Sequence, residues 1–272
     1  MALQALLFDV DGTLADTEPQ GHLPAYNEAF RELGLNWRWS PELYRELLLL
    51  PGGKERIAQY LRQYDPAVGE HRAEIERDAK AWVERVHKIK SRYFRRLVSG
   101  GKVTLRPGVR RLITEADQAG LRMAIVTNAS RSSLEPFLEY TLGKELSERI
   151  DFIVSGEQVA HKKPAPDLYR LALLKLGLKP LECMALEDSS MGLVAATSAG
   201  IPTLITVNED TRHHVFEDAV LVVDKLGEPD DPFRVLQGEP GTDRYVTLRL
   251  LQELLQRVES ESNAEEAAEE EE

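Results

Sequence analysis

Apolar and polar positions follow two different periods along the 272-residue chain. Between residues 19 and 103, apolar side chains recur at helical spacing with charged faces between them, as in Tyr26, Phe30 and Leu33. From residue 105 onward, short unbroken runs of Ile, Val and Leu alternate with helical patterns. The pattern therefore predicts an all-helical segment followed by a segment in which strands and helices alternate.

The alternating segment predicts an α/β fold. Strands are expected near Leu6–Phe8 and at residues 123–127, 152–155, 184–186, 203–207 and 220–223. Helices are expected at residues 108–119, 133–140, 167–176, 191–199 and 246–258. Strands that are apolar throughout and separated by helices are typical of a parallel sheet covered on both faces.

The helical segment interrupts the α/β pattern directly after the first strand. The expected organisation is a core of residues 1–17 and 104–258, a helical insertion of residues 18–103, and a tail of residues 259–272. In open α/β sheets ligands bind beyond the carboxyl ends of the strands, so the insertion follows a strand end where ligands are expected. We expect residues 227–243 to be an extended connection and the tail to be disordered.

The net charge of −12 comes largely from the tail, which holds eight glutamates and no basic residue, so the remainder carries about −4. Such a body lacks the basic clusters typical of nucleic-acid or membrane binding, and we expect neither partner. Cys183 is the single cysteine and lies in an apolar stretch, which predicts packing rather than a disulfide. With no signal sequence or membrane span predicted and no disulfide expected, we expect a cytoplasmic protein. We also expect a monomer.

The first strand runs into Asp9-Val10-Asp11-Gly12. Residues two apart face the same way on a strand, so the two carboxylates are expected to project together, and Gly12 permits a tight turn. Mg²⁺ bound by carboxylates and a substrate phosphate would relieve their repulsion. One carboxylate can then attack phosphorus to form an aspartyl-phosphate, and the other can protonate the leaving oxygen and later activate water. The alternative is a plain acidic turn.

Three later stretches place further chemistry at or beyond strand ends. Thr127 and Asn128 can hold phosphoryl oxygens, although such a pair is also common in turns. Lys163 can offset the charge of nucleophile and phosphate, or it is a solvated loop lysine. Glu187 and Asp188 can hold a metal, or the aspartate caps the next helix. Because all of these stretches fall on one predicted sheet edge, the pattern favours phosphoryl chemistry.

These residues resemble the motifs of the haloacid dehalogenase-like hydrolase superfamily, and within it the CbbY-type sugar-bisphosphate phosphatases, relatives of β-phosphoglucomutase. The stretches that carry the resemblance are Asp9-Val10-Asp11-Gly12-Thr13-Leu14, Asp16-Thr17-Glu18, Gly52-Gly53-Lys54-Glu55-Arg56, His87-Lys88-Ile89-Lys90, Leu105-Arg106-Pro107-Gly108-Val109, Lys163-Pro164-Ala165-Pro166-Asp167, Glu187-Asp188-Ser189 and Leu226-Gly227-Glu228-Pro229. The resemblance implies a Rossmann-like core with a helical cap. It also implies Mg²⁺ held by Asp9, the main-chain oxygen of Asp11, and Asp188, with Glu187 nearby. Asp9 would be the nucleophile and Asp11 the acid and base.

The helical segment contributes candidate substrate-binding residues. Gly52 and Gly53 lead into a helix whose first turns carry Lys54 and Arg56, and such a helix start is suited to an anion, unless it is only a glycine cap with solvated charges. Lys90 matches the lysine with which the related mutases touch substrate, or it belongs to a solvated helix face. The remaining candidates are Glu18, His22 and Arg131.

The sequence thus predicts a Mg²⁺-dependent phosphatase for a small phosphorylated sugar, and the resemblance implies the conversion of xylulose 1,5-bisphosphate to xylulose 5-phosphate. A sugar-phosphate mutase that uses the same aspartyl-phosphate and a phosphoglycolate-type phosphatase are alternative enzymes. Dehalogenases of the superfamily lack the second aspartate, so Asp11 argues against them. From a different class, an inactive regulatory binding protein is the remaining alternative.

Overall fold

The computed structural model describes residues 2–269, which form two compact units. The α/β unit comprises Met1–Ala15, Leu105–Ser130 and Leu142–Glu272. The helical unit comprises Asp16–Thr104 and Arg131–Thr141. The second of these stretches lies outside the helical segment that the sequence predicts, because α6 (Arg131–Pro136) packs against α4 (Arg72–Ser99).

Within the described residues, seven strands form one sheet in the order β3-β2-β1-β4-β5-β6-β7. The strands are β1 Ala5–Phe8, β2 Arg122–Thr127, β3 Phe152–Ser155, β4 Cys183–Glu187, β5 Thr203–Thr206, β6 Leu221–Val223 and β7 Val235–Gln237. The first six are parallel and β7 is antiparallel, which confirms the predicted α/β class. Because β1 lies between β2 and β4, the strand order reverses beside it, and a ligand site is expected at the carboxyl end of β1.

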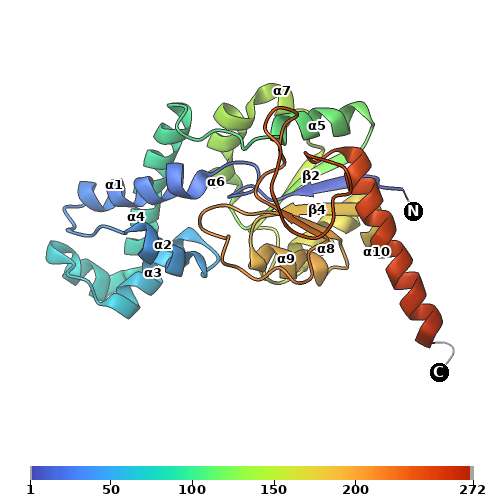
Figure 1. Ribbon diagram of the computed structural model, residues 1–272. Helices are drawn as coiled ribbons and strands as arrows, with labels where there is room; N and C mark the ends of the chain where they lie inside the picture. Colours follow the sequence, from blue (N-terminus) through green and yellow to red (C-terminus); the bar gives the residue numbers. More distant parts are fainter. Residues whose placement is uncertain (1, 270–272) are drawn as a thin grey trace. The chain divides into compact units, whose positions relative to one another are not determined.

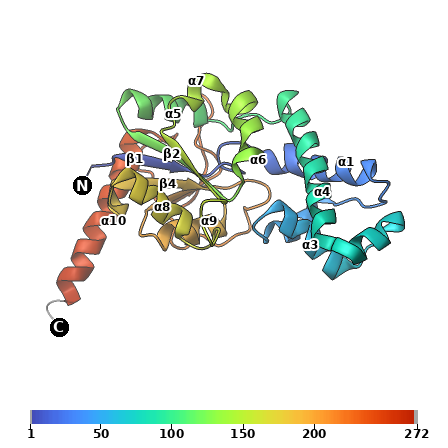
Figure 2. The ribbon, with the colours of Figure 1, turned by 180° about the vertical axis from the view of Figure 1, so that it is seen from behind.

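Helices cover both faces of this sheet (Figures 1 and 2). The helices of the α/β unit are α5 Val109–Gln118, α7 Gly143–Ser147, α8 Asp167–Leu176, α9 Ser190–Thr197 and α10 Leu248–Glu269, with a short 3₁₀ turn at Pro180–Glu182. On the α8 and α9 side, alternate strand residues such as Leu7 and Val126 pack against Leu168. This alternation directs the odd-numbered residues of β1 toward α8, and Asp9 comes next in that series.

The helical unit is built around aromatic side chains. Its helices are α1 Leu23–Glu32, α2 Pro41–Leu48, α3 Gly53–Tyr64, α4 Arg72–Ser99 and α6 Arg131–Pro136, with π-helical turns at Glu18–His22 and Phe137–Leu142 and a 3₁₀ turn at Gly69–His71. Trp39 is buried between Tyr26 and Phe30, with ring centroids 4.6 and 5.0 Å away. Helix α4 is interrupted at Asp78, whose carboxylate accepts a hydrogen bond from the Ala81 amide at 2.9 Å.

Two predictions for the C-terminal part differ from the structure. The expected extended connection of residues 227–243 contains β7, a three-residue edge strand too short to give a recognisable alternation. Helix α10 continues to Glu269 instead of ending at residue 258, so most of the expected disordered tail is helical. Ala and Glu are good helix formers and can extend a helix without packing. Residues 270–272 of the predicted tail lie outside the described residues.

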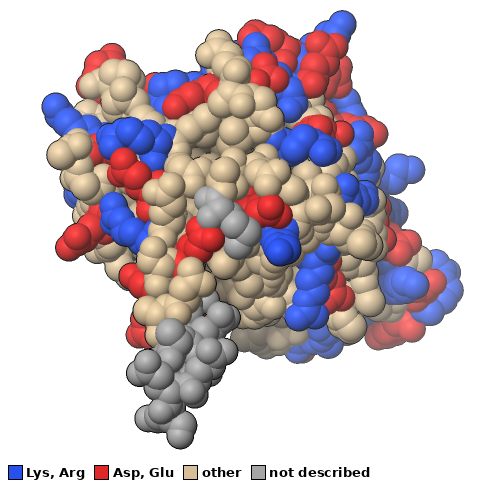
Figure 3. Space-filling view, turned by 90° about the vertical axis from the view of Figure 1, so that its right-hand side faces the viewer, with Lys and Arg blue, Asp and Glu red and all other residues tan. Residues whose placement is uncertain are grey.

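Acidic and basic side chains are interspersed on the face shown in Figure 3. Among residues 2–269, no helix combines the length and the apolar character needed to cross a membrane.

Candidate active site

Asp9 stands where β1 ends and is 7% exposed. Its amide donates to the Leu186 carbonyl at 3.0 Å and so extends the pairing of β1 with β4 by one residue. The chain then turns through Gly12, whose φ of +89° favours glycine and whose amide donates to the Ala15 carbonyl at 2.8 Å. The strand pairing thus directs the Asp9 carboxylate into the interior of the α/β unit.

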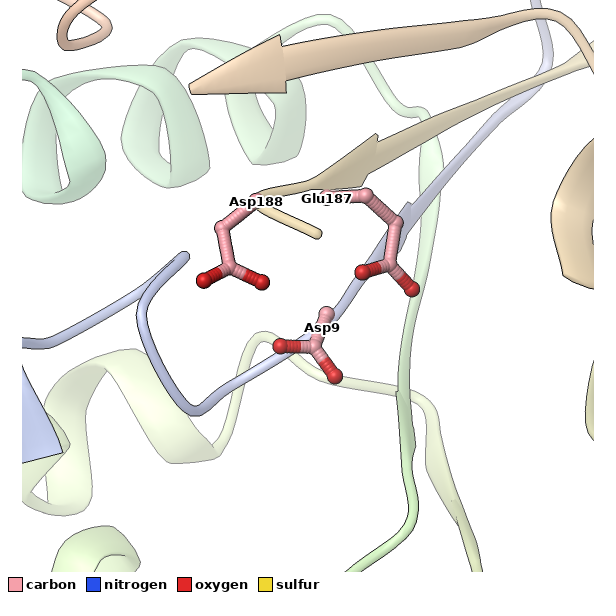
Figure 4. Close-up of side chains that lie close together, drawn as sticks. All are labelled: Asp9, Glu187 and Asp188. Atoms are coloured by element: carbon pink, nitrogen blue, oxygen red, sulfur yellow. The ribbon is translucent and has the colours of Figure 1, made fainter. Parts of the chain in front are cut away.

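Three buried carboxylates converge at this point (Figure 4). Asp9 follows β1, Glu187 ends β4 and Asp188 follows it, and one oxygen of each lies within 4.8 Å of the others. Asp9 and Glu187 project from the same sheet face, since they continue the alternation of Leu7 and Ala185. An all-oxygen set of this kind is suited to a hard divalent cation.

Lys163 is the cation that the structure places in this cluster. It is 3% exposed, and its ammonium donates to Asp9 Oδ1 at 2.7 Å, to Glu187 Oε1 at 2.5 Å and to the Val126 carbonyl at 2.7 Å. The alternative of a solvated loop lysine is therefore wrong. The Tyr169 hydroxyl also donates to Glu187 Oε1, so this carboxylate serves to hold Lys163.

The electrostatics of the cluster favour an added cation. Burial raises the pKa of Asp188 to about 8, and the Glu187 charge adds to the rise. Burial also raises the pKa of Asp9 well above its usual range, although Lys163 opposes this effect. Burial alone would lower the pKa of Lys163, but the charges of Asp9 and Glu187 outweigh it and raise that pKa. Neighbouring carboxyls whose charged forms are disfavoured by burial and mutual repulsion fit a site whose charge balance a metal ion completes.

Asp11 lies outside the three-carboxylate cluster. β1 ends at Phe8, and Asp11 pairs with Ala15 in the turn that follows, so the expectation that both carboxylates project together stays a prediction. Its negative charge nevertheless contributes to the raised pKa of Asp9, which shows that the two acids interact. Its half-buried side chain is therefore separate from the cluster yet within electrostatic reach of Asp9.

Thr127 ends β2 and Asn128 directly follows it, at the predicted strand end. Thr127 is 1% exposed, and its hydroxyl accepts a hydrogen bond from the Ala129 amide at 3.1 Å. The Asn128 side chain bonds the Lys163 main chain twice, accepting from its amide at 2.8 Å and donating to its carbonyl at 3.3 Å. Asn128 thus holds the loop that carries Lys163, and contact of these two residues with a phosphoryl group stays a prediction.

The structure adds two residues that sequence reasoning missed. The Asn208 amide donates to Asp188 Oδ2 at 2.7 Å, and buried Arg106 donates to the Gly12 carbonyl. Asn208 directly follows the predicted strand of residues 203–207, so the strand-end pattern that located the other residues contains a signal for it. Arg106 lies in a stretch that carries the family resemblance, but its role has no signal in the strand-end pattern, since its partners come from segments distant in sequence.

In the helical unit, the two cations expected at the start of α3 have different surroundings. Lys54 is in the first turn, its side chain is 52% exposed, and its ammonium lies 3.5 Å from the Glu84 carboxylate. The Arg56 side chain is 13% exposed and lies 3.4 Å from Glu18 Oε1 and 3.2 Å from the Tyr44 hydroxyl. Lys54 is thus accessible, whereas Arg56 belongs to an internal network that includes Glu18.

The two glycines shape the helix start. Gly52 has φ of +124°, and a Cβ there would lie 2.1 Å from the Glu55 carboxylate, so the position requires glycine. Gly53 begins α3, and its carbonyl accepts a hydrogen bond from the Tyr26 hydroxyl at 3.1 Å. The close approach of Glu55 places an acid at the helix N-terminus, where its charge is favourable.

Lys90 is buried rather than on a solvated helix face, which corrects that alternative. It is 6% exposed, its ammonium lies 2.7 Å from His22 Nδ1, and it stands over the rings of Tyr26 and Phe94 at 4.8 and 5.2 Å. Arg131 begins α6 and is exposed. The predicted residues therefore form one set in the α/β unit and a second set in the helical unit.

The model of haloacid dehalogenase-like hydrolases matches residues 3–200, and the chain belongs to this family. The plasmid CbbY protein of Cupriavidus necator is 46% identical over 85% of this chain and 88% of its own length. CbbY of Rhodobacter sphaeroides, crystallised in complex with phosphate, is 41% identical with a TM-score of 0.74, covering 82% of this chain and 94% of that one. A variant of that protein was crystallised with xylulose-(1,5)bisphosphate and matches equally well. The phosphorylated carbohydrates phosphatase of Thermotoga maritima is 30% identical over 75% of this chain and 85% of its own. The chain is thus a hydrolase, and its relatives support a phosphatase reaction.

Proposed function

We propose that this protein is a Mg²⁺-dependent phosphatase that converts xylulose 1,5-bisphosphate to xylulose 5-phosphate through an aspartyl-phosphate on Asp9. The observation that carries the proposal is the buried group of Asp9, Glu187 and Asp188 with Lys163 bound between the first two. The substrate is supported by the 41% identical CbbY protein of Rhodobacter sphaeroides, a variant of which was crystallised with that bisphosphate.

The residues present fit Mg²⁺. Asp9 and Asp188 would hold it with the main-chain oxygen of Asp11, while Glu187 is engaged by Lys163 and Tyr169 and supports the site indirectly. When bound, Mg²⁺ offsets the negative charge of carboxylates and phosphate so that an anionic nucleophile can approach phosphorus. The raised pKa values of Asp9 and Asp188 show that burial disfavours their charged forms, which a bound cation would stabilise.

In the proposed reaction, Asp9 is the nucleophile, Asp11 is the acid and base, and Lys163 supports Asp9. The Asp9 carboxylate attacks phosphorus, the bond from phosphorus to the sugar oxygen breaks, and that oxygen takes a proton from Asp11. Asp11 then removes a proton from water, which attacks the acyl-phosphate, releases inorganic phosphate and regenerates Asp9. Lys163 keeps Asp9 in place and favours its ionised form through a hydrogen bond of 2.7 Å.

For a bisphosphate, the second phosphate needs a cation of its own. Lys54 is suited to this role because it combines a half-exposed ammonium with the N-terminal turn of α3, where amide groups and the helix dipole favour an anion. Gly52 and Gly53 form that turn. Arg56 would support it through Glu18 and Tyr44.

The proposal is tested by measuring phosphate release from a panel of sugar mono- and bisphosphates with and without Mg²⁺. We expect xylulose 1,5-bisphosphate to have the highest kcat/KM, with one phosphate released per molecule and none without Mg²⁺. An isomeric sugar phosphate formed without net phosphate release would instead establish a mutase. Preference for phosphoglycolate would establish the other phosphatase, and no turnover of any member would indicate a binding protein.

A further inference from the structure

The loop after β5 brings an amide to the metal-binding acids. Asn208 Nδ2 lies 2.7 Å from Asp188 Oδ2. The other end of the same side chain, Oδ1, accepts hydrogen bonds from the amides of Asp210 at 2.8 Å and Thr211 at 3.2 Å. Because the oxygen has these two donors, the amide nitrogen must face Asp188, so the orientation of the side chain is determined by its own loop.

Asp188 and Asn208 both pack closely against Gly12, in the turn that follows Asp9. A Cβ on Gly12 would lie 2.2 Å from Asp188 Oδ2 and 2.6 Å from Asn208 Nδ2, so only glycine allows this packing. The Gly12 carbonyl accepts from Asn208 Nδ2 at 3.4 Å and also from Arg106. One carboxylate oxygen of Asp188 is therefore enclosed by the turn and by the Asn208 amide.

Arg106 links the Gly12 turn to the ends of β5 and β6 by hydrogen bonds. Its guanidinium also donates to the main-chain oxygens of Val207 at 2.6 Å and Asp224 at 2.8 Å, which follow β5 and β6. It is 8% exposed. Arg106 thus binds the carbonyl of Val207, directly before Asn208, and the carbonyl of Gly12. The buried arginine therefore fixes the backbone at Asn208 relative to the Gly12 turn.

We propose that Asn208 is a positioning residue for Asp188: it holds Oδ2 and thereby directs Oδ1 to the cation. The inference rests on the proposed function, because the cation is the Mg²⁺ of that proposal. A carboxylate that is free to rotate must be ordered when the metal binds, whereas a carboxylate held by a neighbour is already oriented. Removing such supporting contacts typically weakens metal binding by about 10- to 100-fold.

The test is calorimetric titration of the full-length protein with Mg²⁺, using Asn208→Ser and Asn208→Ala. Serine keeps an oxygen that can accept from the loop amides but cannot reach Asp188. This variant therefore removes the hydrogen bond to Asp188 while the contacts within the loop can persist. Thr211→Val is the matched control. It removes the hydroxyl that accepts from the main-chain N–H of Asn208 at 3.1 Å and leaves the contact between Asn208 Nδ2 and Asp188 in place. Melting temperatures are recorded for all variants.

We expect both Asn208 variants to raise the Kd for Mg²⁺ by about 10- to 100-fold, with Thr211→Val near wild type. When Mg²⁺ is saturating, the kcat of the Asn208 variants should lie closer to the wild-type value than their affinity for Mg²⁺ does. An Asn208→Ser protein that binds Mg²⁺ within about twofold of wild type, or an equal loss in Thr211→Val, would overturn the inference alone. A wild-type protein that binds no Mg²⁺ would overturn the proposed function together with it.

Discussion

The α/β unit and the helical unit bury their charged groups in different ways. In the α/β unit, Asp9, Lys163 and Glu187 are less than 10% exposed and bind one another directly at the ends of neighbouring strands. In the helical unit, Lys90 is equally buried but lies against a histidine and two aromatic rings. The first arrangement holds opposite charges in direct contact, whereas the second surrounds a cation with a histidine and two neutral rings. Substitutions in the two units should therefore affect different kinetic quantities.

The largest effect is expected for Asp9→Asn. Asparagine is too weak a nucleophile to attack phosphorus, so turnover should fall to background for every substrate. The melting temperature should not fall, because one charge is removed from a crowded acidic cluster. Steady-state assays with thermal melts check both parts. Substantial turnover by this variant would mean that the α/β unit acts through another nucleophile.

Asp11→Asn should have the next largest effect. Removing the proton donor should lower kcat by about 10²- to 10⁴-fold, whereas Mg²⁺ affinity should persist because the main-chain oxygen of Asp11 remains. Calorimetry with Mg²⁺ and kcat measured on the same preparation separate the two roles. A kcat within about threefold of wild type would contradict the acid and base role.

Lys54→Ala tests the helical unit. Charge-assisted contacts to phosphate contribute about 1.5 to 3 kcal/mol, so kcat/KM for the bisphosphate should fall about 10- to 100-fold. An aryl phosphate has no second phosphate, and its hydrolysis should be unchanged. Equal losses for both substrates would show that Lys54 is not specific for the second phosphate.

Arg56→Ala is the matched comparison. This change removes a partner of Glu18 and Tyr44 inside the helical unit, so the melting temperature should fall and both substrates should be affected. If Arg56→Ala instead behaves like Lys54→Ala and leaves stability intact, Arg56 contacts the second phosphate directly.

A smaller effect concerns pH. The pKa of Asp188 is raised from 3.8 to about 8 in the folded protein, so the metal-free fold favours the protonated acid. Its contribution to stability is therefore present at low pH and is lost as pH rises through about 8. Mg²⁺ displaces that proton, so its stabilisation should grow over the same range. Melting temperatures with and without Mg²⁺ between about pH 5 and about pH 9 measure this, and Asp188→Asn should lack it.

The smallest effect is expected from deleting residues 259–272. This segment has eight glutamates and no basic residue, and Ser260 and Glu261 are exposed. Turnover and melting temperature should match the full-length protein. A large loss of activity would show that the acidic segment contributes to one of the units.

The α/β unit was more predictable from sequence than the helical unit, for a physical reason. Parallel strands end at one edge of a sheet, so residues such as Asp9, Thr127 and Asp188 could be assigned to a common site from the hydrophobic pattern alone. Helical periodicity indicates a buried face but not what that face contacts. The burial of Lys90 against His22 therefore had to come from the structure.

Contacts between distant segments account for the rest. Tyr169 reads as one more apolar position of α8, and its hydrogen bond to Glu187 depends on how α8 packs on the sheet. Likewise, Arg106 binds main-chain oxygens at Gly12 and Val207, which share no sequence pattern with it. The short edge strand β7 escaped prediction because three residues do not establish an alternation.

The most direct test of the central claim is intact-protein and peptide mass spectrometry of the enzyme after acid quenching during turnover of xylulose 1,5-bisphosphate. We predict one added phosphoryl group on the peptide that contains Asp9, formed only when Mg²⁺ is present and absent from Asp9→Asn. Asp11→Asn should retain this group for longer, because its hydrolysis needs the base. Turnover without a phosphorylated Asp9, or a phosphoryl group on a different residue, would contradict the account.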